Sequence, residues 1–215
     1  MNIEKNKETF LSLLNRVDRR GIEGLIEYLQ VTDFFTAPRS THYHNCKEGG
    51  LCEHSLNVYY NLKKLNDMYD KPLDEESMIV VALLHDMAKI DFYEKYIQNK
   101  KEYNPRGSQK DSVGYFNWVQ VESYKVKDSM LRPNVYSEHG VCSFIMVNKW
   151  IELNDEETAA IINHHMDMDK SGYVRTDISE IYNRYPLAAL LHIADTMATY
   201  LDENPYIINE EDHSK

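Results

Sequence analysis

The feature that most constrains this chain is an imidazole and a carboxylate that close an apolar run. His85 and Asp86 directly follow residues 78–84, seven apolar residues in a row. Such a run is typically buried, and ionisable groups at its end are costly unless a partner compensates them. A divalent metal ion would compensate them, because neutral imidazole and carboxylate are ligands for many such ions.

Further potential ligands stand on both sides of this pair. His54 lies on a predicted amphipathic helix, 51–69, on the same face as leucine and valine, so we expect it to point inward. At the end of a helix, His85 and Asp86 can both reach one ion, or Asp86 can bridge two. Two close ions would act as paired Lewis acids and would generate a hydroxide nucleophile. The candidate metal ligands are His54, His85, Asp86, His139, His164, His165 and Asp195.

The composition is that of a globular protein, with 42% hydrophobic and 27% charged residues in a chain of 215. This length suits one domain with a sizeable core. We expect a cytoplasmic protein without membrane contact, because no apolar stretch reaches the ~18–20 residues that a membrane helix needs. No signal-peptide pattern or disulfide framework is evident either. The net charge of −11 disfavours extended duplex nucleic acid as a partner, but it permits a small phosphorylated substrate.

The spacing of apolar residues predicts a mostly α-helical fold. A cap at Asp74 starts the helix that carries the His-Asp pair, and Pro186 starts the last helix. His42 and His44 are expected to be ordinary loop residues, with a role toward the substrate as the less favoured alternative. Residues 5–30 carry two successive apolar stripes and are expected to be helical. The other expected helices are 51–69, 74–86, 137–152, 154–165 and 186–201. We also expect a polar loop over 167–184 and a frayed acidic tail.

Residues 91–136 differ in character from the rest of the chain. They hold nine of the 24 aromatic residues, and eight lysines and arginines against six acidic residues. Turn residues at 104–107 separate two stretches rich in aromatic and β-branched residues, which predicts an inserted β-hairpin or a partly ordered loop. Its cations are either a solvated face or a lid that offers charge and stacking to a nucleotide-like substrate. The candidate substrate-binding residues here are Arg106, Lys110, Trp118, Lys125 and Lys127.

The ordered ligands sit in motifs that resemble the HD-domain superfamily of metal-dependent phosphohydrolases. The stretch 42–54 is similar to the start of HD domains in bacterial 3′–5′ exoribonucleases and relaxases. The motifs are Gly-Gly-Leu-Cys-Glu-His54, Leu-Leu-His85-Asp86-Met-Ala-Lys89, Ser-Glu-His139-Gly, Ile-Ile-Asn-His-His165 and His-Ile-Ala-Asp195.

This resemblance implies one HD-type domain over 1–215, a helical bundle with a core at about 41–201 and an N-terminal extension at 1–40. It implies that the first ion is bound by His54, His85, Asp86 and Asp195. His139 and His165 match the ligands of a second ion, with His164 as the alternative to His165. The implied cofactor is one or two divalent ions, with Mn, Fe, Ni, Co, Mg and Zn all chemically possible. Lys89 matches a lysine that commonly contacts a phosphate.

The favoured function is that of a phosphohydrolase or phosphodiesterase acting on a nucleotide-like or short nucleic-acid substrate, with Asp86 and Lys89 as catalytic residues. The runner-up is a mixed-valent diiron oxygenase, because some HD-fold enzymes of that kind have the same ligand order. A third hypothesis is a metal-stabilised sensor module without turnover. Iron content and oxygen consumption would discriminate between the first two.

Overall fold

A computed structural model of the chain describes residues 2–41, 45–130, 139–165 and 178–203. Several expectations lie outside these ranges, namely those for His42 and His44, for the start of the helix at 137, for residues 167–177 and for the C-terminal tail. They stay predictions.

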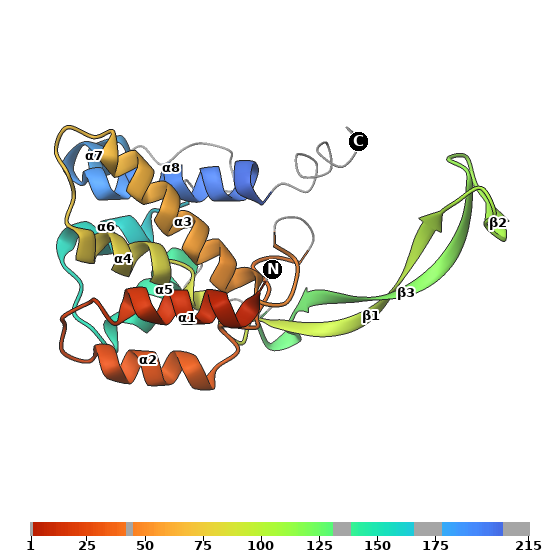
Figure 1. Cartoon of the computed structure of the whole chain (residues 1–215), viewed down its shortest axis with the longest axis horizontal. Helices are drawn as coiled ribbons and strands as arrows, with labels where there is room; N and C mark the ends of the chain where they lie inside the picture. Colours follow the sequence, from red (N-terminus) through yellow and green to blue (C-terminus); the bar gives the residue numbers. More distant parts are fainter. Residues whose placement is uncertain (1, 42–44, 131–138, 166–177, 204–215) are drawn as a thin grey trace.

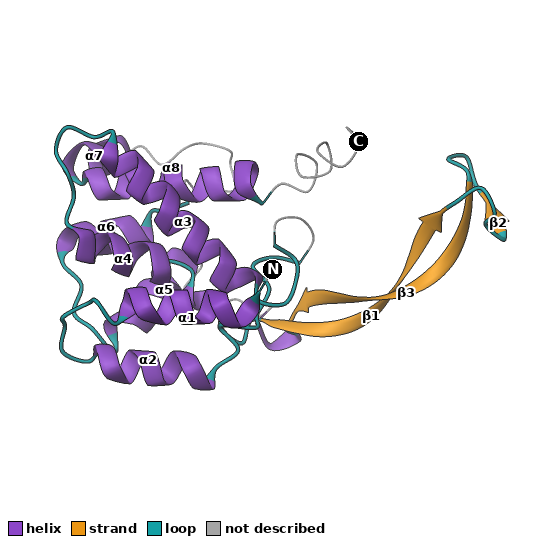
Figure 2. Cartoon of the chain, viewed as in Figure 1, coloured by secondary structure: helices purple, strands orange, loops and turns teal. Residues whose placement is uncertain are grey.

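The described residues form eight α-helices around one hydrophobic core, with a β-hairpin that projects from the bundle (Figures 1 and 2). The mostly helical fold with a small β insertion is therefore confirmed. The α-helices are α1 (Ile3–Leu14), α2 (Ile22–Val31), α3 (Gly50–Asp67), α4 (Glu75–Leu84), α5 (His139–Asn148), α6 (Asp155–Ile162), α7 (Ile178–Arg184) and α8 (Pro186–Met197), with 3-10 turns η1 (Met87–Lys89) and η2 (Asp128–Met130) and a π-helical turn η3 (Ala198–Asp202).

Local sequence signals set the ends of the helices that matter for the site. Asp74 caps α4 by accepting a hydrogen bond from the backbone N–H of Ser77 at 2.8 Å, as its sequence predicts. Asn154 and Glu157 form a capping box at the start of α6, and Pro186 occupies the first turn of α8. Helix α4 is buried from Ser77 to its last residue, so the chain leaves this helix in the middle of the core.

The segment after α4 forms a long antiparallel hairpin, which confirms the β-hairpin interpretation over the loop. Strand β1 (Tyr93–Tyr103) pairs with β3 (Tyr115–Val126) from Tyr93 opposite Val126 to Tyr103 opposite Phe116. The short strand β2 (Gln109–Lys110) adds to the other edge of β3 at the far end. In Figure 1 the hairpin extends away from the helices, and β2 lies at its distal tip.

Three expected boundaries are wrong. Residues 178–184, expected to be loop, form α7, because Ile181 and Tyr182 pack against the core. The helix expected through 152 ends at Asn148, since the chain turns there and Trp150 stacks on Tyr28 with ring centroids 5.2 Å apart. The helix expected through His165 ends at Ile162, so both histidines of the His-His pair lie just beyond α6.

No helix in the described part of the chain is both long and apolar enough to span a membrane.

Candidate metal centre

The structure brings all seven predicted ligands together. His54 lies on α3 and Asp195 on α8, two helices that pack side by side, while His85 caps the C-terminus of α4. His139 begins α5, and the other two histidines follow α6. In each of three groups of side chains, the potential ligand atoms lie within 4.8 Å of one another. The groups are His54 with His85 and Asp86, His85 with His164 and Asp195, and His139 with His164 and His165.

One side of the cluster is formed by His54 and His85. Nε2 of His54 lies 3.0 Å from Oδ1 of Asp195 and 3.7 Å from Oδ2 of Asp86. Nε2 of His85 lies 3.5 Å from the same Oδ2. Both imidazoles are completely buried, so they meet these carboxylates away from bulk water.

The other side is formed by the three remaining histidines. Nε2 of His139 lies 2.9 Å from Nε2 of His164, and these atoms lie 3.6 and 3.7 Å from Oδ1 of Asp86. His165 is more exposed than His164, and its Nε2 lies 3.6 Å from Oδ2 of Asp195. The two oxygens of Asp86 therefore face opposite sides of the cluster, so this one carboxylate lies between both sets of histidines. The choice between His164 and His165 as a ligand stays a prediction.

The hydrogen bonds of the histidines fit a metal centre. Nδ1 of His85 contacts the carbonyl oxygen of Ala82 at 2.9 Å, and Nδ1 of His164 contacts that of Ile161 at 2.7 Å. A carbonyl only accepts, so these nitrogens carry the protons and each Nε2 keeps its lone pair. Metal-binding histidines are commonly oriented in this way.

Three buried atoms that face the centre have no hydrogen bond within the described residues. They are Nε2 of His54, Nε2 of His85 and Oδ1 of Asp86. Buried polar atoms without a partner are rare and destabilising. Coordination to a divalent ion would satisfy all three, and their donor chemistry suits many such ions.

Burial keeps most of the imidazoles neutral. It lowers the pKa of His85 to about 3, that of His139 to about 2 and that of His165 to about 4. A metal ion would therefore meet free lone pairs on these rings at neutral pH.

The carboxylates set the charge of the centre. Burial alone would raise the pKa of Asp86, but Lys89 and the neighbouring histidines outweigh it and hold the pKa well below its ordinary value. Burial and Arg39 alone would lower the pKa of His54. The carboxylates of Glu203 and Asp195 outweigh them, so the pKa of His54 is raised above its ordinary value. The carboxylates on this side therefore favour positive charge at His54.

A close helix contact places His139 beside His164. A Cβ atom at Gly140 would lie 2.5 Å from the carbonyl oxygen of Ile162 and 2.8 Å from that of Ile161. Only glycine therefore lets the first turn of α5 approach the last turn of α6 this closely.

Two cations border the carboxylates. Nζ of Lys89 lies 2.6 Å from Oδ2 of Asp86, and a guanidinium nitrogen of Arg39 lies 3.4 Å from Oδ1 of Asp195. Arg39 is buried, and its Nε has no hydrogen-bond partner among the described residues. Sequence reasoning missed Arg39, because a single arginine in a loop carries no pattern. It also missed Glu203, whose carboxylate contacts His54 at 3.0 Å.

The hairpin residues predicted to bind substrate do not reach the cluster. Lys125 pairs with Glu94 at 2.8 Å and Lys127 with Asp91 at 3.7 Å, at the base of the hairpin. The other three, Arg106, Lys110 and Trp118, lie toward its far end, away from the helices (Figure 1). Their role in substrate binding stays a prediction.

One of three comparisons with known proteins agrees with this geometry. A family model described as the HD domain matches residues 51–200, which include every residue of the cluster. Neither the curated proteins nor the solved structures that were compared with the chain gave a match. Because the family model covers more than half of the sequence, the chain belongs to the HD-domain family, whose members are mostly metal-dependent phosphohydrolases.

Proposed function

We propose that this protein is a metal-dependent phosphohydrolase or phosphodiesterase that acts on a nucleotide-like or short single-stranded nucleic-acid substrate. One observation carries the proposal. Nε2 of His54, Nε2 of His85 and Oδ1 of Asp86 are buried at the centre without hydrogen-bond partners among the described residues. Lys89 and Arg39 border the carboxylates of Asp86 and Asp195.

The ligands divide into two sets around Asp86. His54, His85 and Asp195 would hold one ion together with Asp86, and the remaining histidines would hold a second ion beside the same carboxylate. When bound, the metal would supply Lewis-acid polarisation of a phosphoryl oxygen and a water of lowered pKa. Asp86 would fix the spacing of the two positions.

Lys89 and Arg39 would bind the phosphoryl group. Both side chains are mostly buried, so their charges act at low dielectric on the oxygens that become more negative during the reaction. The guanidinium offers a planar fork of donors, which suits a phosphate better than a point charge does. These two cations favour an anionic substrate and hence the hydrolase over the diiron oxygenase.

The hairpin would select longer substrates. Lys101, Trp118 and Phe116 form a cation–π group on one face, with the ammonium 4.4 Å from the Phe116 ring and 5.7 Å from the Trp118 ring. At about 3.4 Å per residue, the far end of β1 lies roughly 30 Å from its base, so a mononucleotide at Lys89 would not reach it. A single strand of several nucleotides would span this distance and could stack on the exposed Trp118.

The proposal is tested by a hydrolysis assay with a phosphodiester reporter and a panel of nucleotides, with each candidate metal added in turn. We expect metal-dependent hydrolysis that Asp86→Ala abolishes while circular dichroism stays helical, and that the exposed-site variant Asp70→Ala retains. Hydrolysis by Asp86→Ala at the wild-type rate would contradict the proposal. Oxygen consumption by the iron-loaded protein, without hydrolysis, would instead favour the oxygenase.

A further inference from the structure

The carboxylate of Glu203 lies directly behind one of the proposed metal ligands. Oε1 of Glu203 is 3.0 Å from Nδ1 of His54, on the ring edge away from the cluster. Both side chains are buried, so water does not compete for this contact. A carboxylate in this place accepts the Nδ1 proton and leaves Nε2 as a lone pair toward the centre.

A π-helical turn brings Glu203 to this place. Asp195 and Glu203 are eight positions apart, which on a continuous α-helix would separate their directions by about 80°. The chain instead widens into η3 from Ala198 to Asp202, and the backbone N–H of Glu203 bonds the carbonyl oxygen of Ala198 at 3.0 Å. The wider turn rotates the chain less per residue and turns Glu203 back toward the face that carries Asp195.

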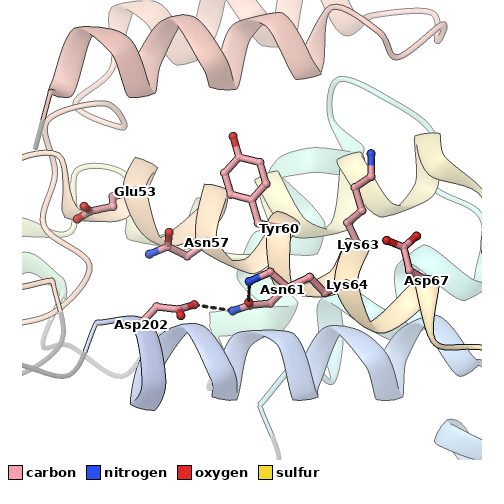
Figure 3. A pocket seen from close by; sticks show the side chains of 8 residues that line it. All are labelled: Glu53, Asn57, Tyr60, Asn61, Lys63, Lys64, Asp67 and Asp202. Carbon is pink, nitrogen blue, oxygen red and sulfur yellow. Dashed lines mark hydrogen bonds between the residues drawn. The ribbon is translucent and has the colours of Figure 1, made fainter. Parts of the chain in front are cut away.

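Two asparagines of α3 hold the η3 turn and Glu203 in place. Nδ2 of Asn57 donates to Oε1 of Glu203 at 3.1 Å, and Nδ2 of Asn61 donates to Oδ2 of Asp202 at 2.7 Å. Asn57 and Asn61 follow His54 by three and seven positions, so all three lie on one face of the helix. Figure 3 shows both asparagines and Asp202 in the groove between α3 and η3.

We propose that Glu203 is a positioning residue of the metal centre, which fixes the Nδ1–H tautomer and the ring orientation of His54 and makes its Nε2 a stronger ligand. This inference rests on the proposed function, because it requires that the cluster bind metal. Carboxylates that orient metal-bound histidines typically contribute 10–100-fold to metal affinity. The adjacent Asp202 also binds an asparagine of α3 but does not touch a proposed metal ligand. A variant at Asp202 therefore tests the docking of η3 on α3 separately from the positioning of His54.

The test measures the affinity for Mn²⁺, and separately for Zn²⁺, by titration calorimetry on the full chain, together with the melting temperature of the metal-free protein. Glu203→Ala should weaken binding about 10–100-fold. Glu203→Gln keeps an acceptor oxygen and should rescue part of the loss, and it also serves if Glu203→Ala fails to fold. Asp202→Asn, the matched control, should bind metal like the wild type even where its melting temperature falls.

The outcomes separate the two proposals. If the wild type binds neither of these ions nor any other of the candidate metals, the proposed function fails and the inference fails with it. If the wild type binds metal and Glu203→Ala binds it equally tightly, the inference is overturned and the proposed function stands. An equal loss of affinity in Asp202→Asn and Glu203→Ala would also overturn the inference, because the effect would then come from undocking of the η3 turn from α3.

Discussion

Nε2 of His139 and Nε2 of His164 lie 2.9 Å apart, although the two residues are 25 positions apart in the chain. The proton of His164 is on Nδ1, which contacts a backbone carbonyl at 2.7 Å, so its Nε2 is a lone pair. A lone pair this close to a second imidazole nitrogen is satisfied either by a proton from His139 or by an ion between the rings. Burial lowers the pKa of His139 to about 2, so this ring is neutral at physiological pH and carries a single proton.

The first prediction concerns the glycine that permits this contact. Gly140→Ala should push α5 away from the end of α6 and destabilise the protein by about 1–3 kcal/mol, the usual cost of overpacking. It should also reduce the number of ions bound per chain, since His139 moves away from His164. Thermal unfolding and a metal titration check both effects. Gly114→Ala is the control, because its Cβ would meet nothing closer than 4.0 Å; equal behaviour of the two variants would refute the close-contact argument.

Sequence reasoning could find the ligands but not the residues that serve them. His54, His85 and Asp195 stand in apolar segments with helical spacing, where an ionisable side chain is conspicuous. Arg39 and Glu203 act only through contacts made across the fold, with Asp195 and His54 respectively, and nothing in their local sequence marks them.

The same limit explains the errors in the fold. Capping signals at Asp74 and Asn154 located helix starts correctly, because caps are local interactions. The hairpin was predictable from its composition, but its projection away from the helices was not, since no sequence pattern reports where a strand pair points. Helix α7 was missed because packing of Ile181 and Tyr182, rather than a strong periodic pattern, stabilises it.

The second prediction concerns Arg39. Arg39→Lys keeps the positive charge beside Asp195 but loses the fork of donors, so it should lower kcat/KM for a phosphorylated substrate about tenfold, the loss of one charged hydrogen bond. Metal affinity should change little. Steady-state kinetics on the metal-loaded protein tests this, with Arg20→Lys at an exposed site as the control. Unchanged kinetics in Arg39→Lys would remove Arg39 from the substrate site.

The third prediction concerns a buried ion pair remote from the site. Glu157 is fully buried and accepts hydrogen bonds from Arg19 at 2.6 and 2.7 Å and from Ser77 at 2.6 Å. Glu157→Gln should lower the free energy of unfolding by about 3 kcal/mol, because it leaves Arg19 partly uncompensated. Glu75→Gln, in the half-exposed pair with Arg16, should cost under about 1 kcal/mol.

The pH dependence of stability follows from the same residue. Burial would raise the pKa of Glu157, but the hydrogen bonds from Arg19 and Ser77 outweigh it and lower the pKa. The folded state therefore binds this proton less readily than the unfolded state, so the stabilisation is present above the unfolded pKa of roughly 4.3. This stabilisation should be lost as the pH falls from the unfolded pKa through the folded pKa of Glu157. Urea unfolding at several pH values should show a smaller acid dependence in Glu157→Gln; an identical dependence would contradict this assignment.

The fourth prediction concerns the hairpin. Replacing residues 100–119 by a two-residue Asn-Gly turn keeps the base of the hairpin, where Asn99 and Gln120 face each other. The shortened protein should hydrolyse a mononucleotide reporter like the wild type but show a raised KM for single strands of several nucleotides. A KM that is unchanged at every substrate length would show that the far end of the hairpin is exposed to solvent and does not bind substrate.

The central claim is that the seven converging side chains form a metal centre, and metal binding by the purified chain tests it most directly. Elemental analysis and titration calorimetry should find one or two divalent ions per chain in the wild type. Asp86→Ala, which removes the carboxylate between both sets of histidines, should lose this binding while keeping its helical circular dichroism. A folded wild-type chain that binds no divalent ion, or an Asp86→Ala variant that binds as tightly as the wild type, would contradict the account.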